Sequence, residues 1–261
     1  MDLGLAGKRA LVLGASRGLG AAIARTLALE GADVVAASRN LDKITSWMAE
    51  LPADVQARVT PATVDLFDVA SVEALASGIG AKGGADILVN NSGGPPPATA
   101  QEAPRDIWLK QFEAMAANLI HLTQLLLPHM QEKRWGRIIT VSSSGVEQPI
   151  PRLALSNGIR SALIGWSKTL SSEVAANGVT VNVVLPGRIA TERIAELDNA
   201  AAKQSGKSVD EVAKASIATI PAGRLGDPQE FANVVAFLAS EKASYVTGAK
   251  VRVDGGATRS I

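Results

Sequence analysis

The sequence of 261 residues contains no cysteine and only two histidines, His121 and His129. The absence of cysteine excludes disulfide bonds, thiol nucleophiles and thiolate metal ligands. Two histidines are too few for an imidazole-rich metal site, so we expect no bound metal. A chain without disulfides is compatible with a reducing compartment, and we predict a cytoplasmic protein.

The chain also lacks an excess of charge of one sign and a long hydrophobic run. Its 26 basic and 25 acidic side chains leave a net charge of +1, and it has four Trp, four Phe and one Tyr. Nucleic-acid binding requires a basic surface or aromatic stacking platforms, so we predict no nucleic-acid partner. No apolar run approaches the ~18 residues of a membrane span, and the first residues lack the apolar core of a signal peptide, so we predict no membrane association.

Apolar runs recur along the chain at regular intervals. Each run is continuous rather than alternating, which predicts strands buried on both faces. Segments with helical spacing separate them, such as Leu19, Ile23 and Leu27 before a helix-ending Gly31. We therefore predict an α/β fold with a doubly wound parallel sheet, helices on both faces, and residues 1–261 in one domain. The seven predicted strands are Arg9–Leu13, Asp33–Ala37, Val59–Val64, Asp86–Val89, Arg137–Val141, Thr180–Leu185 and Val251–Val253.

A glycine-rich turn follows the first predicted strand and leads into a helix predicted over Ala21–Glu30. Glycines let the backbone approach a phosphate closely, and a helix N-terminus adds free N–H groups and the positive end of its dipole. A tight strand-to-helix turn also favours glycine for structural reasons alone, but its place in the first strand–helix unit favours a dinucleotide site. The residues of this turn are Gly14, Ser16, Arg17, Gly18, Leu19 and Gly20.

The segment from Gly14 to Gly18 also fits the G-x-S-x-G pattern of a hydrolase, with Ser16 as the nucleophile. A hydrolase of this kind needs a histidine base late in the chain. Both histidines instead lie in or at the end of the apolar-periodic segment Ile107–Met130, so we favour phosphate binding.

The end of the second predicted strand indicates which dinucleotide binds. An acidic residue there would accept hydrogen bonds from the adenosine ribose of NAD, but Asp33 lies at the opposite end of the strand. The strand instead ends at Ser38 and Arg39. Arg39 and Arg17 are suited to flank a 2′-phosphate through charge-assisted hydrogen bonds, which predicts NADP(H). The alternative is two solvated arginines.

Motifs along nearly the whole chain resemble the short-chain dehydrogenase/reductase family, closest to its 3-oxoacyl-[acyl-carrier-protein] reductase branch. The resemblance implies a seven-stranded Rossmann-type sheet in the order 3-2-1-4-5-6-7, a nicotinamide cofactor across the strand C-termini and a homotetramer. The motifs are Gly14–Gly20, Asp65-Leu66, Asn90–Gly93, Asn118, Ser142–Ser144, Pro186-Gly187, Gly223–Gly226, Tyr245–Gly248 and Asp254–Gly256.

The resemblance also implies the remaining contacts to the cofactor. Asp65 and Leu66 are expected near the adenine. The other expected contacts are Asn91, Ser92 and Gly93 along the cofactor, and Pro186, Gly187, Ile189 and Thr191 around the nicotinamide carboxamide.

The active site departs from the pattern of the family it resembles. Asn118 and Ser143 match the family's catalytic Asn and Ser, but Ser156 and Arg160 stand where the family has Tyr and Lys. A tyrosine beside an ammonium group can donate a proton near neutral pH, whereas a serine hydroxyl is far less acidic. Arg160 can still hold a ribose hydroxyl and place positive charge near the oxyanion, but its high pKa stops it from relaying protons.

Another group must then supply the proton. The candidates are a water held by Asn118 and Ser143, which we favour, and the side chains of Glu147, Arg152 and His121. Tyr245, the only tyrosine, belongs to a late motif and is expected to be structural.

Two functional classes remain. The first is an NADP(H)-dependent oxidoreductase acting slowly on a small carbonyl or secondary alcohol, and the second is a catalytically impaired NADP(H)-binding protein with a regulatory or structural role. Residues 188–224 form a long connection expected to cover the substrate. Arg188 and Arg193 begin it, and they are suited either to hold an anionic substrate or simply to be solvated.

Overall fold

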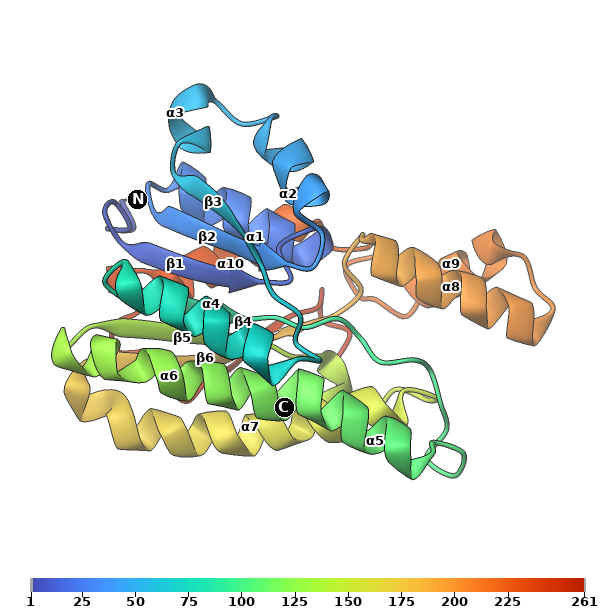
Figure 1. The fold of residues 1–261 in the computed structure, drawn as a ribbon. Helices are drawn as coiled ribbons and strands as arrows, with labels where there is room; N and C mark the ends of the chain where they lie inside the picture. Colours follow the sequence, from blue (N-terminus) through green and yellow to red (C-terminus); the bar gives the residue numbers. More distant parts are fainter. Residues whose placement is uncertain (1, 261) are drawn as a thin grey trace.

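The centre of the molecule is a seven-stranded parallel sheet in a computed structural model that describes residues 2–260 (Figure 1). The strand order is β3-β2-β1-β4-β5-β6-β7, and every neighbouring pair is parallel. The structure confirms the predicted doubly wound fold and the predicted strand order. The strands, each bounded within one residue of its predicted range, are β1 (Arg9–Leu13), β2 (Asp33–Ser38), β3 (Val59–Thr63), β4 (Ile87–Asn90), β5 (Gly136–Val141), β6 (Val179–Pro186) and β7 (Lys250–Val253).

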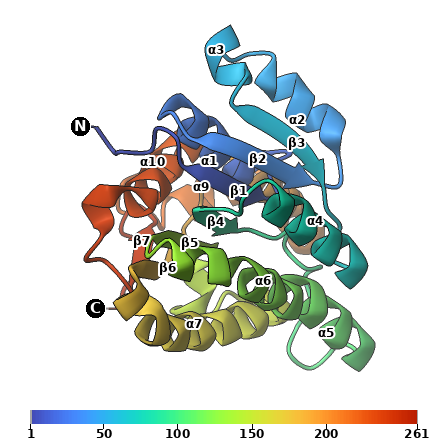
Figure 2. The same cartoon turned by 60° about the vertical axis from the view of Figure 1, so that its left-hand side comes forward.

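Helices cover both faces of the sheet (Figure 2). On one face, α1 (Gly18–Leu29) packs against α10 (Pro228–Ala239), and Ile23 and Phe231 are fully buried in that layer. On the other face lie α4 (Val69–Ala81), α6 (Asn118–Glu132) and α7 (Ala154–Val174), with Leu119 and Leu163 in the core. The central strands are therefore sealed on both sides, which explains their continuous apolar runs. The short helices α2 (Leu41–Met48) and α3 (Ala53–Gln56) connect β2 to β3.

Two predicted helical segments have different boundaries in the structure. Helix α1 begins at Gly18, three residues before the predicted Ala21, and Gly31 follows its end with φ +93°. The segment predicted as helical over Ile107–Met130 consists of α5 (Arg105–Phe112), a π-helical turn at Glu113–Ala117 and α6. Such turns are typical of functional sites, and this one delivers Ala114 and Met115 to the cavity described below.

Residues of the predicted covering segment form α8 (Glu192–Ser205) and α9 (Val209–Ile217). This helix pair extends away from the sheet beyond the C-terminal ends of the strands, where it is drawn in orange (Figure 1). Among residues 2–260, no helix combines the length and apolar character that crossing a bilayer requires.

Candidate active site

A cavity of about 800 Å³ lies where the turns after β1, β2, β3, β4, β5 and β6 meet α8. Ligand pockets commonly have this size, and doubly wound folds place them at this edge of the sheet. Ser143, Ser156 and Arg160 line it, together with all the predicted cofactor residues: Gly14, Ser16, Arg17, Gly18, Leu19, Gly20, Ser38, Arg39, Asp65, Leu66, Asn91, Ser92, Gly93, Pro186, Gly187, Ile189 and Thr191.

The glycine turn forms a cradle that side chains would fill. Gly14 and Gly18 have φ values of +62° and +56°, and a Cβ added to Gly20 would lie 2.2 Å from the carbonyl oxygen of Gly14. The N-cap of α1, Arg17, makes no side-chain hydrogen bond to the first turn, so free N–H groups face the cavity. Ser92 on the opposite wall has a buried hydroxyl without a hydrogen-bond partner among the described residues. These features fit a dinucleotide diphosphate.

Two basic side chains lie at the end of the cavity beside β2, where Asp65 also lines the wall and Glu192 lies 3.9 Å from Lys43. Arg39 and Lys43 line it there, and Ser38 at the end of β2 bonds the backbone of Asn40. Trp47 of α2 donates to the carbonyl oxygen of Ala15 at 2.9 Å and thereby fixes α2 to the glycine turn. The charge at this end fits a 2′-phosphate better than a bare ribose.

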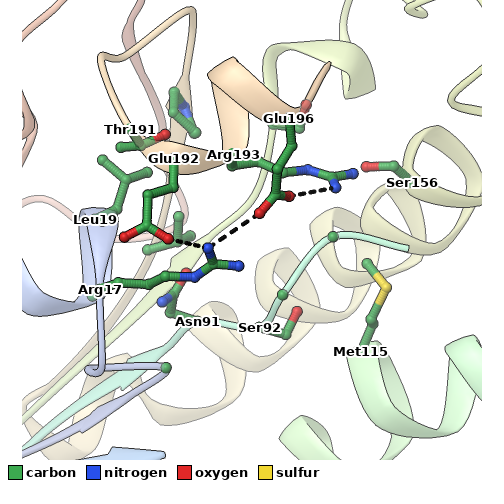
Figure 3. A pocket seen from close by; sticks show the side chains of 18 of the residues that line it. Arg17, Leu19, Asn91, Ser92, Met115, Ser156, Thr191, Glu192, Arg193 and Glu196 are labelled. Carbon is green, nitrogen blue, oxygen red and sulfur yellow. Dashed lines mark hydrogen bonds and ion pairs between the residues drawn. The ribbon is translucent and has the colours of Figure 1, made fainter. Parts of the chain in front are cut away.

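Arg17 lines the cavity, but its guanidinium is paired with carboxylates rather than free for a 2′-phosphate. Its guanidinium spans the mouth of the cavity and pairs with Glu192 and, at 3.1 Å, with Glu196 (Figure 3). The hydrogen bond from Arg17 lowers the pKa of Glu192, and that bond raises the pKa of Arg17. Arg17 therefore holds α8 against the glycine turn in this state and does not stand free beside Arg39.

Three of the four expected catalytic residues converge on the opposite end of the cavity. Ser143 follows β5, and its hydroxyl accepts a hydrogen bond from the backbone N–H of Gly145 at 3.1 Å. Ser156 and Arg160 are one turn apart on α7 and are both buried. Ser156 and Arg160 thus line the same cavity as Ser143, and their catalytic roles stay a prediction.

Arg160 is a buried cation held by carbonyl groups. It donates to Val141 O at 2.9 Å and, more weakly, to the carbonyl oxygens of Ser92 and Gly93 at 3.3 and 3.4 Å. Burial and the nearby charge of Arg193 lower the pKa of Arg160 to about 10. The group is still protonated at neutral pH, so it supplies fixed positive charge and not a proton.

Asn118 is the expected catalytic residue that lies outside the cavity lining. Its side-chain amide is buried and donates to the carbonyl oxygen of Leu66 at 2.9 Å. This placement differs from the expected contact with substrate or water. The geometry gives Asn118 a positioning role, since it fixes the turn after β3 that carries Asp65 and Leu66.

The alternative proton donors are engaged or exposed away from the cavity. His121 contacts Glu73 of α4 at 3.0 Å, and Glu147 lies between Lys250 and Arg252. Arg152 is exposed in a turn with φ +62°, and Tyr245 is fully exposed. Within the part of the chain that the structure describes, none of these four side chains lines the cavity. A water as the proton source therefore stays a prediction, and the side chain of Asn118, which bonds Leu66, does not take the expected part in holding it.

The two arginines at the start of the covering segment have separate roles. Arg188 pairs with the buried carboxylate of Asp198 on α8, which anchors that helix. Arg193 points into the cavity, donates to Pro95 O at 3.0 Å and lies 3.4 Å from Glu196. Both arginines line the cavity, but the carboxylate of Asp198 engages Arg188, whereas Arg193 has the more exposed partner Glu196.

Sequence reasoning missed the acidic partners of Arg17 and several apolar wall residues. Glu192 and Glu196 are four residues apart, a spacing that places them on one helix face, and this signal was readable in the sequence. The apolar wall residues Met115, Ile150, Leu153, Ile194 and Leu197 carry no motif and were identifiable only from the fold.

Known proteins match this chain over nearly its full length. A family described as Enoyl-(Acyl carrier protein) reductase matches residues 14–258. The 3-oxoacyl-[acyl-carrier-protein] reductase FabG of Escherichia coli (strain K12) is 39% identical over 254 residues, covering 96% of this chain and 97% of that protein.

Solved structures also match nearly the whole chain. L-sorbose reductase from Gluconobacter frateurii, complexed with NADPH and L-sorbose, superposes with a TM-score of 0.93 at 33% identity, covering 100% of both chains. YwfH, an NADPH dependent reductase involved in bacilysin biosynthesis, superposes with a TM-score of 0.91 at 31% identity, covering 98% of this chain and 100% of that chain.

Proposed function

The chain belongs to the short-chain dehydrogenase/reductase family, and from that premise we propose that it is an NADP(H)-dependent oxidoreductase interconverting a small carbonyl compound and its secondary alcohol. The observation that carries the proposal is one continuous cavity with a glycine cradle and basic groups at one end and Ser143 beside Ser156 at the other. We propose that residues 188–224 cover the substrate.

Different parts of the cavity wall bind the diphosphate and the 2′-phosphate of the cofactor. The turn Gly14–Gly20 and the N-terminus of α1 hold the diphosphate, because free N–H groups and the helix dipole favour an anion there. Arg39 and Lys43 contact the 2′-phosphate. Asn91, whose side-chain amide donates to Leu13 O at 3.1 Å, joins the ends of β1 and β4 beneath the cofactor.

A bound NADPH supplies the hydride, and the residues of this chain orient the carbonyl group and stabilise its charge. The hydroxyl of Ser143 donates to the carbonyl oxygen of the substrate. Arg160 places a positive charge beside that oxygen in a water-poor wall, where charge stabilisation is strongest. Ser156 holds a water that delivers the proton to the oxygen, and solvent replaces that proton. Because this water is a weaker acid than a tyrosine beside a lysine, turnover is slow by a factor of roughly 10²–10⁴.

The test is NADPH consumption by the purified protein with a panel of small ketones and aldehydes. We expect slow turnover that depends on both NADPH and the carbonyl compound, and its loss in Ser143→Ala while NADPH still binds. Tight NADPH binding with no turnover on any carbonyl compound would instead favour the impaired binding protein. Ser156 and Arg160, in place of the family's Tyr and Lys, are the observation behind that second candidate.

We also propose a homotetramer, as the family resemblance implies. In support, α5 and α6 leave Leu109, Phe112 and Leu125 exposed by 53%, 43% and 44%. A subunit interface on α5 and α6 would bury these apolar side chains. Light scattering at micromolar concentration checks this, and the mass of one 26.9 kDa chain would contradict it.

A further inference from the structure

Arg193 is the one basic side chain of the covering helix α8 that faces the reacting end of the cavity. Figure 3 shows its guanidinium pointing toward Ser156. The contacts to Pro95 O and Glu196 fix the direction of the side chain. Gly94 leaves the space for it, since a Cβ at that position would lie 2.8 Å from Nη2 of Arg193.

Positive charge exceeds negative charge around Ser156. Arg160 and Arg193 are close enough for the charge of Arg193 to lower the pKa of Arg160. The bonds that the structure gives to Arg160 all go to neutral carbonyl oxygens. Glu196 is the carboxylate beside Arg193, and it is shared with Arg17. Arg160 and Arg193 therefore share one nearby carboxylate, which also pairs with Arg17. The remaining positive charge favours an anionic ligand between the two arginines.

We propose that Arg193 is a specificity residue that binds the carboxylate of the substrate, so that the preferred substrates are 2- or 3-oxo acids rather than neutral ketones or esters. The inference rests on the proposed function because it names the substrate class of the same site. A guanidinium fork matches a carboxylate with two parallel hydrogen bonds. The small side chain of Ser156 leaves room for that carboxylate, whereas a tyrosine ring at position 156 would point toward Arg193. When the substrate carboxylate binds Arg193, Glu196 remains paired with Arg17.

The experiment compares each oxo acid with its own ethyl ester, which removes the charge and keeps the carbonyl group. Pyruvate and ethyl pyruvate form the 2-oxo pair, and acetoacetate and ethyl acetoacetate form the 3-oxo pair. The variants are Arg193→Gln, Arg193→Lys and Gly94→Ala. Lys203→Gln is the control, since it removes an exposed positive charge from the same helix outside the cavity.

We expect the wild type to use at least one acid about tenfold or more better than its ester. Arg193→Gln is expected to lower kcat/KM for that acid by about 10- to 100-fold, mainly through KM, because a charge-assisted bond of this strength is lost. The ester rates and NADPH affinity stay within about twofold, as does every parameter of Lys203→Gln. Arg193→Lys keeps the charge but loses the fork, and Gly94→Ala displaces the guanidinium, so both give intermediate losses.

A binding measurement separates this inference from the proposed function. Oxamate, an unreactive analogue of a 2-oxo acid, is titrated by calorimetry into the protein with NADP⁺ bound. Binding by the wild type that is weakened in Arg193→Gln supports the carboxylate site even if no ketone is reduced. Equal use of acids and esters, with Arg193→Gln changing neither, overturns the inference and leaves NADPH-dependent reduction standing. Thermal unfolding of each variant checks that the fold is kept.

Discussion

Arg17, at the N-cap of α1, forms an ion pair with Glu192 in the first turn of α8, and this contact joins the glycine turn to the covering helix across the mouth of the cavity. The two residues are 175 positions apart in the chain. We expect a cofactor phosphate that binds at the glycine turn to compete with Glu192 and Glu196 for Arg17. The ion pair therefore opposes the binding of the ligand that the cavity is suited to hold.

The first prediction follows from that competition. Glu192→Gln combined with Glu196→Gln should tighten NADPH binding by roughly two- to fivefold, since exposed ion pairs are weak and the competing charges are removed. Higher salt should shrink the difference, because exposed charges are screened. Fluorescence titration with NADPH measures both effects. Glu132→Gln, which removes an exposed carboxylate from the end of α6, should change nothing. Weaker NADPH binding by the double variant would show that these carboxylates assist the cofactor.

The second prediction concerns Arg39 and the choice of dinucleotide. The wild type should bind NADPH at least tenfold more tightly than NADH, and Arg39→Ala should remove most of that difference by weakening NADPH alone. A tenfold change corresponds to about 1.4 kcal/mol. Calorimetric titration of both dinucleotides gives the two dissociation constants. Arg105→Ala on α5, an exposed arginine outside the cavity lining, is the matched control. Equal affinities in the wild type would overturn the assignment of Arg39.

The third prediction concerns stability in acid. Asp86, buried at the start of β4, accepts from the backbone N–H of Arg9 at 2.9 Å and from Lys133 at 3.0 Å. Burial alone raises the pKa of Asp86, but these hydrogen bonds outweigh it and the net pKa is lowered. The stabilisation is therefore present above the unfolded-state pKa of about 4 and is lost as the pH falls through the folded-state value.

Asp86→Asn should lower the free energy of unfolding by about 1–2 kcal/mol at neutral pH, since an amide keeps one hydrogen bond but loses the charge. The difference from wild type should shrink as the pH falls below about 4. Urea unfolding at several pH values measures it. Asp33→Asn, at an exposed position at the start of β2, should have little effect at any pH. A constant difference across the pH range would show that the charge of Asp86 contributes nothing.

The fourth prediction restores the proton donor of the family. Ser156→Tyr with Arg160→Lys should raise the reduction of a neutral ketone by up to ~10²–10⁴-fold. Each single change should do much less, because a tyrosine without the lysine keeps its high pKa. The ring also needs Arg193 to move from its direction toward Ser156 (Figure 3), so Arg193→Gln in the same background should increase the gain. A folded double variant that binds NADPH and shows no gain on any ketone would favour the impaired binding protein.

Much of the fold was predictable because local patterns determine it. Continuous runs such as Ile87–Val89 are required in strands covered on both faces, and Gly31 marks the end of α1 through its positive φ. The cavity wall was predictable for a related reason, since the turns after parallel strands meet at one edge of the sheet.

The contacts between distant side chains were not predictable in the same way. The partner of Arg17 depends on how α8 folds back over the glycine turn, which no local pattern encodes. The amide of Asn118 bonds Leu66 across 52 positions of the chain, and the π-helical turn that precedes Asn118 has no signature in the residues Glu113–Ala117. Arg188 and Arg193 look alike in the sequence, and only the buried carboxylate of Asp198 separates their roles.

Transfer of deuterium from NADPH to a carbonyl compound is the direct measure of hydride transfer by this protein. The protein is incubated with NADPH in which both hydrogens at C4 of the nicotinamide are deuterium and with a panel of oxo acids and ketones, and the products are analysed by mass spectrometry. The account predicts an alcohol with one deuterium on its former carbonyl carbon, formed by the wild type and lost in Ser143→Ala. Bound NADPH with no labelled alcohol from any carbonyl compound would contradict it.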